Sequence, residues 1–282
     1  MEGSVRIDAP AETDCAGEPV VTQKTGTLFG VGMGPGDPDL LTVKAMRVLE
    51  RAPVLVHFCK QGKRGNARTI ADAVLRDPAR EFPLAYPYTT ELPPDHPNYV
   101  AALASFYDEA SDRLADHLGA GRDVAILSEG DPFFYGSFMH LWRRLKDRFP
   151  VEVIPGVTGM SGCWTRAGTP ITWGDDVLTI LPATLPRAAL VERLKGTDAA
   201  VILKLGRHLP KVRGVLAETG FLDRAVYVER GTMAGERVIP LAQKPDDSAP
   251  YFSMVLVPGE GRRPGIAEAS RSSASAPATR AC

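Results

Sequence analysis

Between residues 28 and 42 the chain reads Leu28-Phe29-Gly30-Val31-Gly32-Met33-Gly34-Pro35-Gly36-Asp37-Pro38-Asp39-Leu40-Leu41-Thr42. A short apolar run here leads into four glycines on alternate residues, and a helical pattern starts after the prolines. Because glycine has no Cβ, a strand that runs into such a loop can bring bare backbone against a ligand. The segment therefore predicts a strand–loop–helix unit with a binding site at the end of its strand.

The glycine spacing of this loop differs from that of two common phosphate-binding loops. A dinucleotide site has the pattern G-x-G-x-x-G, and here Gly30 and Gly32 fit but the third glycine position is Pro35. A P-loop ends in Gly-Lys-Ser or Gly-Lys-Thr, and neither tripeptide occurs in the chain. The loop belongs to neither class, and a plain tight turn remains the alternative.

Two later segments repeat the arrangement of strand, turn and helix. Glu129-Gly130-Asp131-Pro132 follows an apolar run, and Pro155-Gly156 follows another. Glu129 and Asp131 are either a pair of carboxylates for acid–base chemistry or a helix cap with a surface acid. Ligands of open α/β sheets lie outside the carboxyl ends of the strands, so three glycine-rich turns at one edge predict a cleft.

Apolar runs and helical patterns alternate along the chain, which predicts an α/β fold with a parallel sheet. In the first half we expect strands at 27–32, 53–57, 123–128 and 151–155, and helices at 39–51, 67–75, 99–118, 135–148 and 157–167. In the second half we expect strands at 177–181, 199–203, 225–229, 236–240 and 251–257, and helices at 187–194 and 209–219. The polar segment 243–250 is expected to be a hairpin loop in an antiparallel end of the second sheet.

The pattern of strands and helices in the sequence changes near residues 169–176, which divides the chain into two α/β domains. We expect an N-terminal domain over 25–170 and a C-terminal domain over 171–261. The terminal segments 1–24 and 262–282 lack periodicity or are rich in Ser, Ala, Pro and Arg, and we expect them to be disordered.

Composition narrows the function classes further. The net charge of −1 makes a nucleic-acid partner unexpected, and no apolar run is long enough to span a membrane. Four widely spaced cysteines without a C-x-x-C motif predict free thiols in a reducing, cytoplasmic setting. The five histidines show no metal-ligand spacing, so no metal site is expected. The G-x-S-x-G elbow of serine hydrolases is also missing from the sequence.

Four motifs in this order resemble the tetrapyrrole methylase family. They are G-x-G-P-G-D-P-x-L-L-T at Gly32 to Thr42, E-G-D-P at Glu129 to Pro132, I-P-G-V-T-x-x-S-G at Ile154 to Gly162, and V-E-x-G-T at Val228 to Thr232. Within the family, the run Glu129 to Phe138 and the insertion 86–118 resemble members that methylate C-20 of precorrin-2 to give precorrin-3A in cobalamin biosynthesis.

The resemblance implies two α/β domains in a homodimer, with S-adenosyl-L-methionine folded between the domains and S-adenosyl-L-homocysteine as product. Carried over by motif, the cofactor-binding positions are Pro35, Glu129, Gly130, Asp131, Phe134, Thr158, Gly159, Leu205 and Gly231. His57 and Tyr135 are candidates on the substrate side, and Lys60, Arg64 and Arg68 are candidates for the carboxylates of the tetrapyrrole.

The resemblance implies an in-line methyl transfer, in which positioning does most of the catalytic work. No residue is assigned as a catalytic base. Three alternatives stay open: a cobalt-containing substrate, another tetrapyrrole methylase, and a non-catalytic tetrapyrrole carrier with a vestigial cleft. A hydrolase that uses Glu129 and Asp131 is disfavoured because the two acids lie on one short proline-containing loop.

Overall fold

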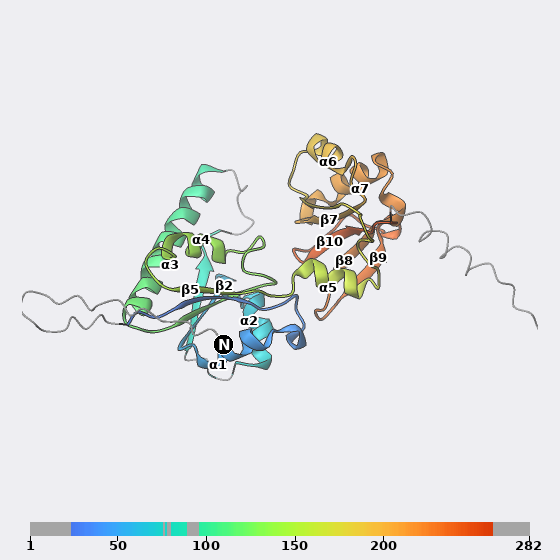
Figure 1. Cartoon of the computed structure of the whole chain (residues 1–282). Coiled ribbons are helices and arrows are strands. Elements are labelled where there is room, and N and C mark those ends of the chain that lie inside the picture. The colour runs from blue at the N-terminus through green and yellow to red at the C-terminus, as the bar shows by residue number, and fades with distance from the viewer. Residues whose placement is uncertain (1–23, 76, 78–79, 89–95, 262–282) are drawn as a thin grey trace, which may run out of the picture.

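The computed structural model describes residues 24–75, 77, 80–88 and 96–261. These residues form two lobes, each built on a five-stranded sheet (Figure 1). We call residues 27–156 the N-lobe and residues 157–261 the C-lobe. The segments predicted to be disordered, 1–24 and 262–282, lie outside the described residues except for Lys24. Within the described residues, no helix combines the length and the apolar character needed to cross a membrane.

The N-lobe sheet has the strand order β3-β2-β4-β1-β5, and all four of its pairings are parallel, as the sequence predicts. Its strands are β1 (Leu28–Gly32), β2 (Val54–Lys60), β3 (Glu81–Tyr86), β4 (Val124–Ser128) and β5 (Val151–Ile154). Its helices are α1 (Val43–Arg51), α2 (Asn66–Ile70), α3 (Pro97–Gly119) and α4 (Phe138–Leu145). The unpredicted strand is β3, which contains Pro83 and lies at the sheet edge, where a missing N–H is tolerated.

Two layers of helices cover the two faces of this sheet. Leu28, Val56 and Ile126 pack against apolar residues of α3 and α4 on one face. Val31, Leu55 and Leu127 pack against α1 and α2 on the other. Successive side chains of a strand point to opposite faces, so these buried strands carry apolar residues on both. The core therefore holds the strand ends, and the loops that follow them, in a defined position.

Two predicted helices of the N-lobe are shorter than expected. The expected helix at 39–51 is divided into a 3-10 turn, Pro38–Leu40, and the helix α1. Thr42 caps the start of α1, because its side chain accepts a hydrogen bond from the Ala45 N–H. The expected helix at 135–148 begins only at Phe138, because Tyr135 has a φ of 54°, outside the right-handed helical region. Both corrections lengthen the loops that follow β1 and β4.

The C-lobe sheet has the order β6-β7-β10-β8-β9. Its strands are β6 (Leu178–Pro182), β7 (Ala199–Leu203), β8 (Val226–Glu229), β9 (Arg237–Pro240) and β10 (Ser253–Val257), and its helices are α5 (Gly159–Arg166), α6 (Arg187–Leu194) and α7 (Leu209–Glu218). The β6–β7 pair is parallel and the other pairs are antiparallel, as predicted for this end of the chain. The predicted hairpin at 243–250 is wrong, since β9 pairs with β8 while β10 lies between β7 and β8.

The helix α5 belongs to the core of the C-lobe. Its residue Cys163 packs with Val201, Val228 and Leu256, and Figure 1 shows the helix beside β8 and β10. Because β5 belongs to the N-lobe sheet and α5 packs on the C-lobe sheet, the chain passes from one lobe to the other between β5 and α5. This crossing precedes the predicted division at 170 and 171, so α5 is the element in which the predicted domain ranges and the packing differ.

Candidate functional site

The three glycine-rich turns lie side by side because they follow the neighbouring strands β4, β1 and β5. The Gly130 N–H donates to the Gly34 carbonyl oxygen at 2.8 Å, which links the turn after β4 to the turn after β1. The expectation that these turns share one edge of the sheet is confirmed. The site at this edge is a backbone surface assembled from three separate parts of the sequence.

Close approach of the backbones explains why glycine is needed here. A Cβ on Gly156 would lie 2.0 Å from the Gly130 carbonyl oxygen and 2.8 Å from Gly32 Cα. Gly130 has a φ of 64°, in the left-handed region that favours glycine. Any side chain at Gly32 or Gly156 would therefore force the turns apart.

Asp131 braces these turns. Its Oδ1 accepts a hydrogen bond from the Phe133 N–H at 2.9 Å, and its Oδ2 accepts one from the Gly156 N–H at 3.1 Å. Both oxygens of the carboxylate are thus engaged by backbone. The expected helix cap is wrong, because α4 begins only at Phe138, after Ser137, and the Asp131 carboxylate joins two turns instead.

Glu129, two residues earlier, points to a different element. The side chain of Asn66 and the N–H of Ala67, at the start of α2, are its hydrogen-bond partners. Burial raises the pKa of the Glu129 carboxyl, and these two hydrogen bonds act in the opposite direction. Glu129 and Asp131 therefore do not form the symmetric carboxylate pair that a hydrolase would need.

A pocket of about 180 Å³ opens between the lobes at this edge. The N-lobe contributes the turns after β1 and β4 and the start of α2, and the C-lobe contributes the start of α5, the end of β7 and the start of β10. Its lining residues are Gly34, Pro35, Asn66, Ile70, Glu129, Gly130, Asp131, Phe134, Tyr135, Gly159, Met160, Leu203, Lys204, Met233, Tyr251, Phe252, Ser253 and Met254.

Most of the predicted cofactor positions lie along this pocket. They are Pro35, Glu129, Gly130, Asp131, Phe134 and Gly159, and the predicted substrate residue Tyr135 lies there as well. The other three predicted positions do not line it. Thr158 caps α5 by accepting from the Ser161 N–H, Leu205 is fully buried in the C-lobe core, and Gly231 packs against Cys163. All nine remain predictions as ligand contacts.

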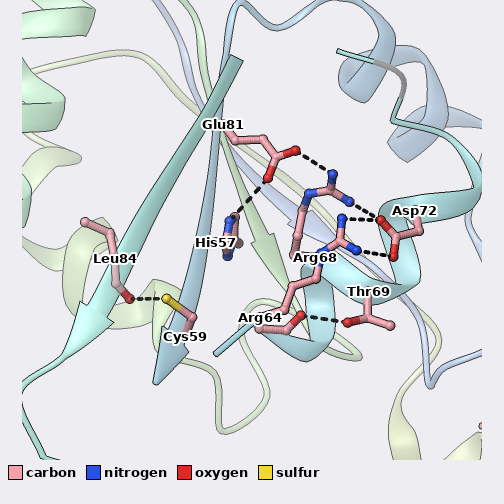
Figure 2. Close-up of polar contacts among 9 residues, drawn as sticks. His57, Cys59, Arg64, Arg68, Thr69, Asp72, Glu81 and Leu84 are labelled. Atoms are coloured by element: carbon pink, nitrogen blue, oxygen red, sulfur yellow. Dashed lines mark hydrogen bonds and ion pairs between the residues drawn. The ribbon is translucent and has the colours of Figure 1, made fainter. Parts of the chain in front are cut away.

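His57, the other predicted substrate residue, lies outside the pocket in a buried ionic cluster (Figure 2). Its Nε2 is 3.6 Å from Glu81 Oε2, and burial lowers the pKa of the imidazole. Arg68 is also buried and bridges Glu81 and Asp72, with N–O distances of 2.5 and 2.6 Å. Its guanidinium is therefore occupied within the fold rather than presented to a substrate.

Arg64 and Lys60 remain at the surface. Arg64 pairs with Asp72 on the outside of the same cluster, with about half of its side chain exposed. The cluster as a whole fastens α2, which carries Asn66 and Ile70 to the pocket wall. It therefore contributes to the site by positioning an element, and the predicted contact with substrate stays a prediction for Lys60 and Arg64.

Loops of the two lobes also contact each other at the wall of the pocket. The Pro35 ring packs on α5, where a Cβ on Gly162 would lie 2.7 Å from Pro35 Cβ. The Asp37 N–H donates to Thr232 Oγ1 at 3.3 Å, and a Cβ on Gly36 would lie 2.2 Å from Met233 Cγ. The loop after β1 is thus part of the contact between the lobes as well as a wall of the pocket.

Sequence reasoning missed the pocket residues that arrive from the C-lobe strands. Lys204, Tyr251 and Met254 line the pocket, yet they occur in ordinary strand ends of the sequence. The only signal near Lys204 was Gly206, which indicates a turn but does not indicate a binding or catalytic role. Within the described ranges, no group of three His, Cys, Asp or Glu side chains could hold a metal ion.

Comparison with known proteins agrees with this architecture. Residues 27–244 match the sequence profile of the tetrapyrrole (corrin/porphyrin) methylases. A precorrin-2 C(20)-methyltransferase of Sinorhizobium is 56% identical, over 85% of this chain and 98% of its own. A cobalt-precorrin-2 C(20)-methyltransferase of Salmonella typhimurium is 27% identical, over 82% of this chain and 96% of its own.

A solved structure has the same fold. It is the uroporphyrin-III C-methyltransferase of Thermus thermophilus in complex with S-adenosylhomocysteine, and it is 24% identical to this chain. The two superpose with a TM-score of 0.56, over 82% of this chain and 97% of that one. The profile match over most of the sequence, the 56% identity and the shared fold lead to one conclusion: this chain belongs to the tetrapyrrole (corrin/porphyrin) methylase family.

Proposed function

We propose that this protein transfers a methyl group from S-adenosyl-L-methionine to C-20 of precorrin-2, giving precorrin-3A in cobalamin biosynthesis. The observation that carries the proposal is the pocket between the lobes, whose backbone turns are intact and tightly packed. Its support from comparison is the relative of 56% identity, whose name states this activity.

The cofactor occupies the pocket between the turns of the N-lobe and the strand ends of the C-lobe in this proposal. Pro35, Gly130 and Gly159 present backbone to it, and Phe134 offers an apolar surface. Asp131, which also lines the pocket, holds the turns together. The cofactor supplies an activated methyl group, so the task of the chain is to hold the acceptor carbon in line with it.

In this proposal the substrate is metal-free precorrin-2 rather than its cobalt form. The relative named for precorrin-2 is 56% identical, whereas the one named for cobalt-precorrin-2 is 27% identical. A difference of this size between relatives that each match more than four-fifths of this chain favours the metal-free reaction. A homodimer in the cytoplasm completes the proposal by analogy with the family, and light scattering of the purified protein tests the oligomeric state.

One experiment tests both the reaction and its position. The purified protein is incubated with labelled S-adenosylmethionine and either precorrin-2 or its cobalt form, and the product is examined by mass spectrometry and NMR. The expected product is precorrin-2 methylated once, at C-20. A methyl group at another carbon contradicts the proposed regiochemistry, and tetrapyrrole binding without any cofactor binding favours the non-catalytic carrier.

A variant tests the place of the cofactor. Gly130→Arg puts a long side chain into the pocket at a buried position next to Gly159. We expect loss of S-adenosylhomocysteine binding in calorimetry while the circular dichroism spectrum stays that of a folded protein. Unchanged affinity would place the cofactor elsewhere.

A further inference from the structure

Lys204 is the basic side chain of the pocket. Among the lining residues, which are all described, no other Lys, Arg or His occurs, so Lys204 is the one positive group facing the ligand space. It follows β7 directly and reaches the pocket from the C-lobe. Its side chain is exposed, as a group that meets an incoming ligand must be.

The ammonium of Lys204 is held against Tyr135 of the other lobe. Its Nζ lies 4.8 Å from the centroid of the Tyr135 ring, within the range of a cation–π contact. Tyr135 is itself about half exposed on the pocket wall. The contact thus crosses the opening between the lobes and holds a flexible side chain in one region of the pocket.

The backbone at both residues is strained. Lys204 has a φ of 58° and Tyr135 a φ of 54°, a left-handed conformation that residues with a Cβ adopt at a cost. Such strain persists only where the surrounding structure imposes it, and it concentrates at ligand-binding sites. Four non-glycine residues of the described chain have a positive φ, and two of them, Lys204 and Tyr135, form one contact that lies on the pocket.

Lys204 has no carboxylate partner among the described residues, where its only charge-specific neighbour is the Tyr135 ring. The acids of the pocket have other partners. Asp131 accepts two backbone hydrogen bonds, and Glu129 is bonded to the start of α2. An aromatic face is no conventional hydrogen-bond acceptor, so the N–H donors of the ammonium that point away from the ring stay available to an oxygen anion.

We propose that Lys204, seated on Tyr135, is the binding residue for a carboxylate of the bound ligand. The inference rests on the proposed function, which brings two carboxylate-bearing molecules to this pocket. These are the tetrapyrrole, with its acetate and propionate side chains, and the cofactor, with its amino-acid carboxylate. In both cases the ammonium forms a charge-assisted hydrogen bond that fixes the ligand against the cleft.

Lys204→Asn is the informative variant because asparagine tolerates the left-handed backbone better than most residues. Lys204→Arg keeps the charge, and Lys195→Asn is the matched control, since Lys195 is an exposed lysine of the same lobe that does not line the pocket. Two affinities are measured for each protein: that of uroporphyrin III, a stable tetrapyrrole octacarboxylate, by fluorescence, and that of S-adenosylhomocysteine, by calorimetry.

Losing a hydrogen bond to a charged group weakens binding by about 10- to 100-fold. If the carboxylate is that of the tetrapyrrole, Lys204→Asn weakens the binding of uroporphyrin III by this factor. The affinity for S-adenosylhomocysteine then stays within twofold of the wild-type value. If the carboxylate is that of the cofactor, the binding of S-adenosylhomocysteine is weakened instead. Methylthioadenosine, which lacks the amino-acid part, then has the same affinity for wild type and variant. Lys204→Arg retains most of the affinity, and Lys195→Asn changes neither.

Equal affinities of wild type and Lys204→Asn for both ligands overturn the inference, and so does a wild type that binds neither. A failure of the proposed function gives a different result, since the binding measurements involve no methyl transfer. A wild type without turnover whose uroporphyrin III affinity still depends on Lys204 refutes the reaction and retains the carboxylate site.

Discussion

At the scale of single residues, the site depends on glycines that allow backbones to touch. Gly32 ends β1, whereas Gly130 and Gly156 lie in the turns after β4 and β5. Each occupies space that a Cβ would fill or a conformation that a Cβ disfavours. Asp131 then holds two of the turns together through both of its carboxylate oxygens. These residues shape the pocket without supplying reactive groups.

Replacing Gly156 by Ala tests this packing. The new Cβ would lie 2.0 Å from the Gly130 carbonyl oxygen, so the turns must separate. We expect the free energy of unfolding to fall by about 2 kcal/mol, the cost typical of overpacking, as measured by urea denaturation. The control is Gly119→Ala at the end of α3, where nothing lies within 4 Å of the new Cβ and stability should be unchanged or slightly higher. Equal stabilities of the two variants would argue against the close approach.

At the scale of elements, the short helix α2 is fastened to the sheet by charges. Arg68 in α2 binds Glu81 of β3 and Asp72 of the following turn, and His57 of β2 lies beside Glu81 (Figure 2). A helix of five residues has little stability of its own, so its place depends on such contacts. Through α2, the cluster positions the partners of Glu129 at the pocket.

The two arginines of this cluster should contribute very differently to stability. Arg68→Ala leaves Glu81 without its buried cation, and we expect a loss of about 3 kcal/mol in unfolding free energy. Arg64→Ala removes a partner of the same Asp72 at the surface, and we expect a change below about 1 kcal/mol. Denaturant unfolding of the two variants in parallel measures both losses. Similar losses of unfolding free energy would mean that the buried ion pairs contribute no more to stability than the surface pair.

The buried His57 should make stability depend on pH. Burial lowers its pKa in the fold below the ordinary value of 6.5, with Glu81 acting to raise the pKa and Arg68 and Arg64 acting to lower it. The unfolded chain therefore binds the proton first as pH falls, and stability decreases below pH 6.5 until the folded pKa is reached. His117, His140 and His208 shift in the same direction.

His57→Gln should remove part of this dependence. Each group of this kind can change the unfolding free energy by at most about 1.4 kcal/mol per pH unit, so the variant should lose less stability than wild type between pH 7 and pH 5.5. Urea denaturation at both pH values measures the difference. Identical slopes for wild type and variant would mean that His57 is solvated in the fold.

At the scale of the whole molecule, the pocket exists only because two lobes meet. Loops of the N-lobe contact α5 and the turn at Thr232, and Tyr135 contacts Lys204 across the opening. A ligand bound there touches both lobes. It should therefore couple their stabilities, with a gain of about 2.7 kcal/mol at a ligand concentration one hundred times Kd.

Hydrogen exchange can locate that coupling. With S-adenosylhomocysteine bound, we expect slower exchange at 34–37 and 129–136 in the N-lobe and at 203–206 and 232–233 in the C-lobe, because bound ligand suppresses local opening. The helix α6 lies away from the pocket lining and serves as the internal control. Protection confined to one lobe would show that the ligand does not bridge the cleft.

Local pattern was enough to predict the parallel sheet and the three glycine-rich turns at one of its edges, because alternating apolar runs and glycine turns act over a few residues. The family came from the resemblance of four motifs. The strand β3 escaped prediction because Pro83 is unfavourable in a strand except at an edge, and only the assembled sheet makes Glu81–Tyr86 an edge. Likewise, the residues of α5 do not by themselves indicate on which of the two sheets this helix packs.

Tertiary structure alone decided which chemical groups share the pocket. Tyr135 and Lys204 are far apart in the sequence and lie in different lobes, yet their side chains meet at 4.8 Å. Arg68 and His57 resemble surface binding residues in the sequence, and the fold buries both beside Glu81. The physical reason is that burial and distance in space depend on how the two sheets pack and on the docking of the lobes, which the local preferences of each segment do not encode.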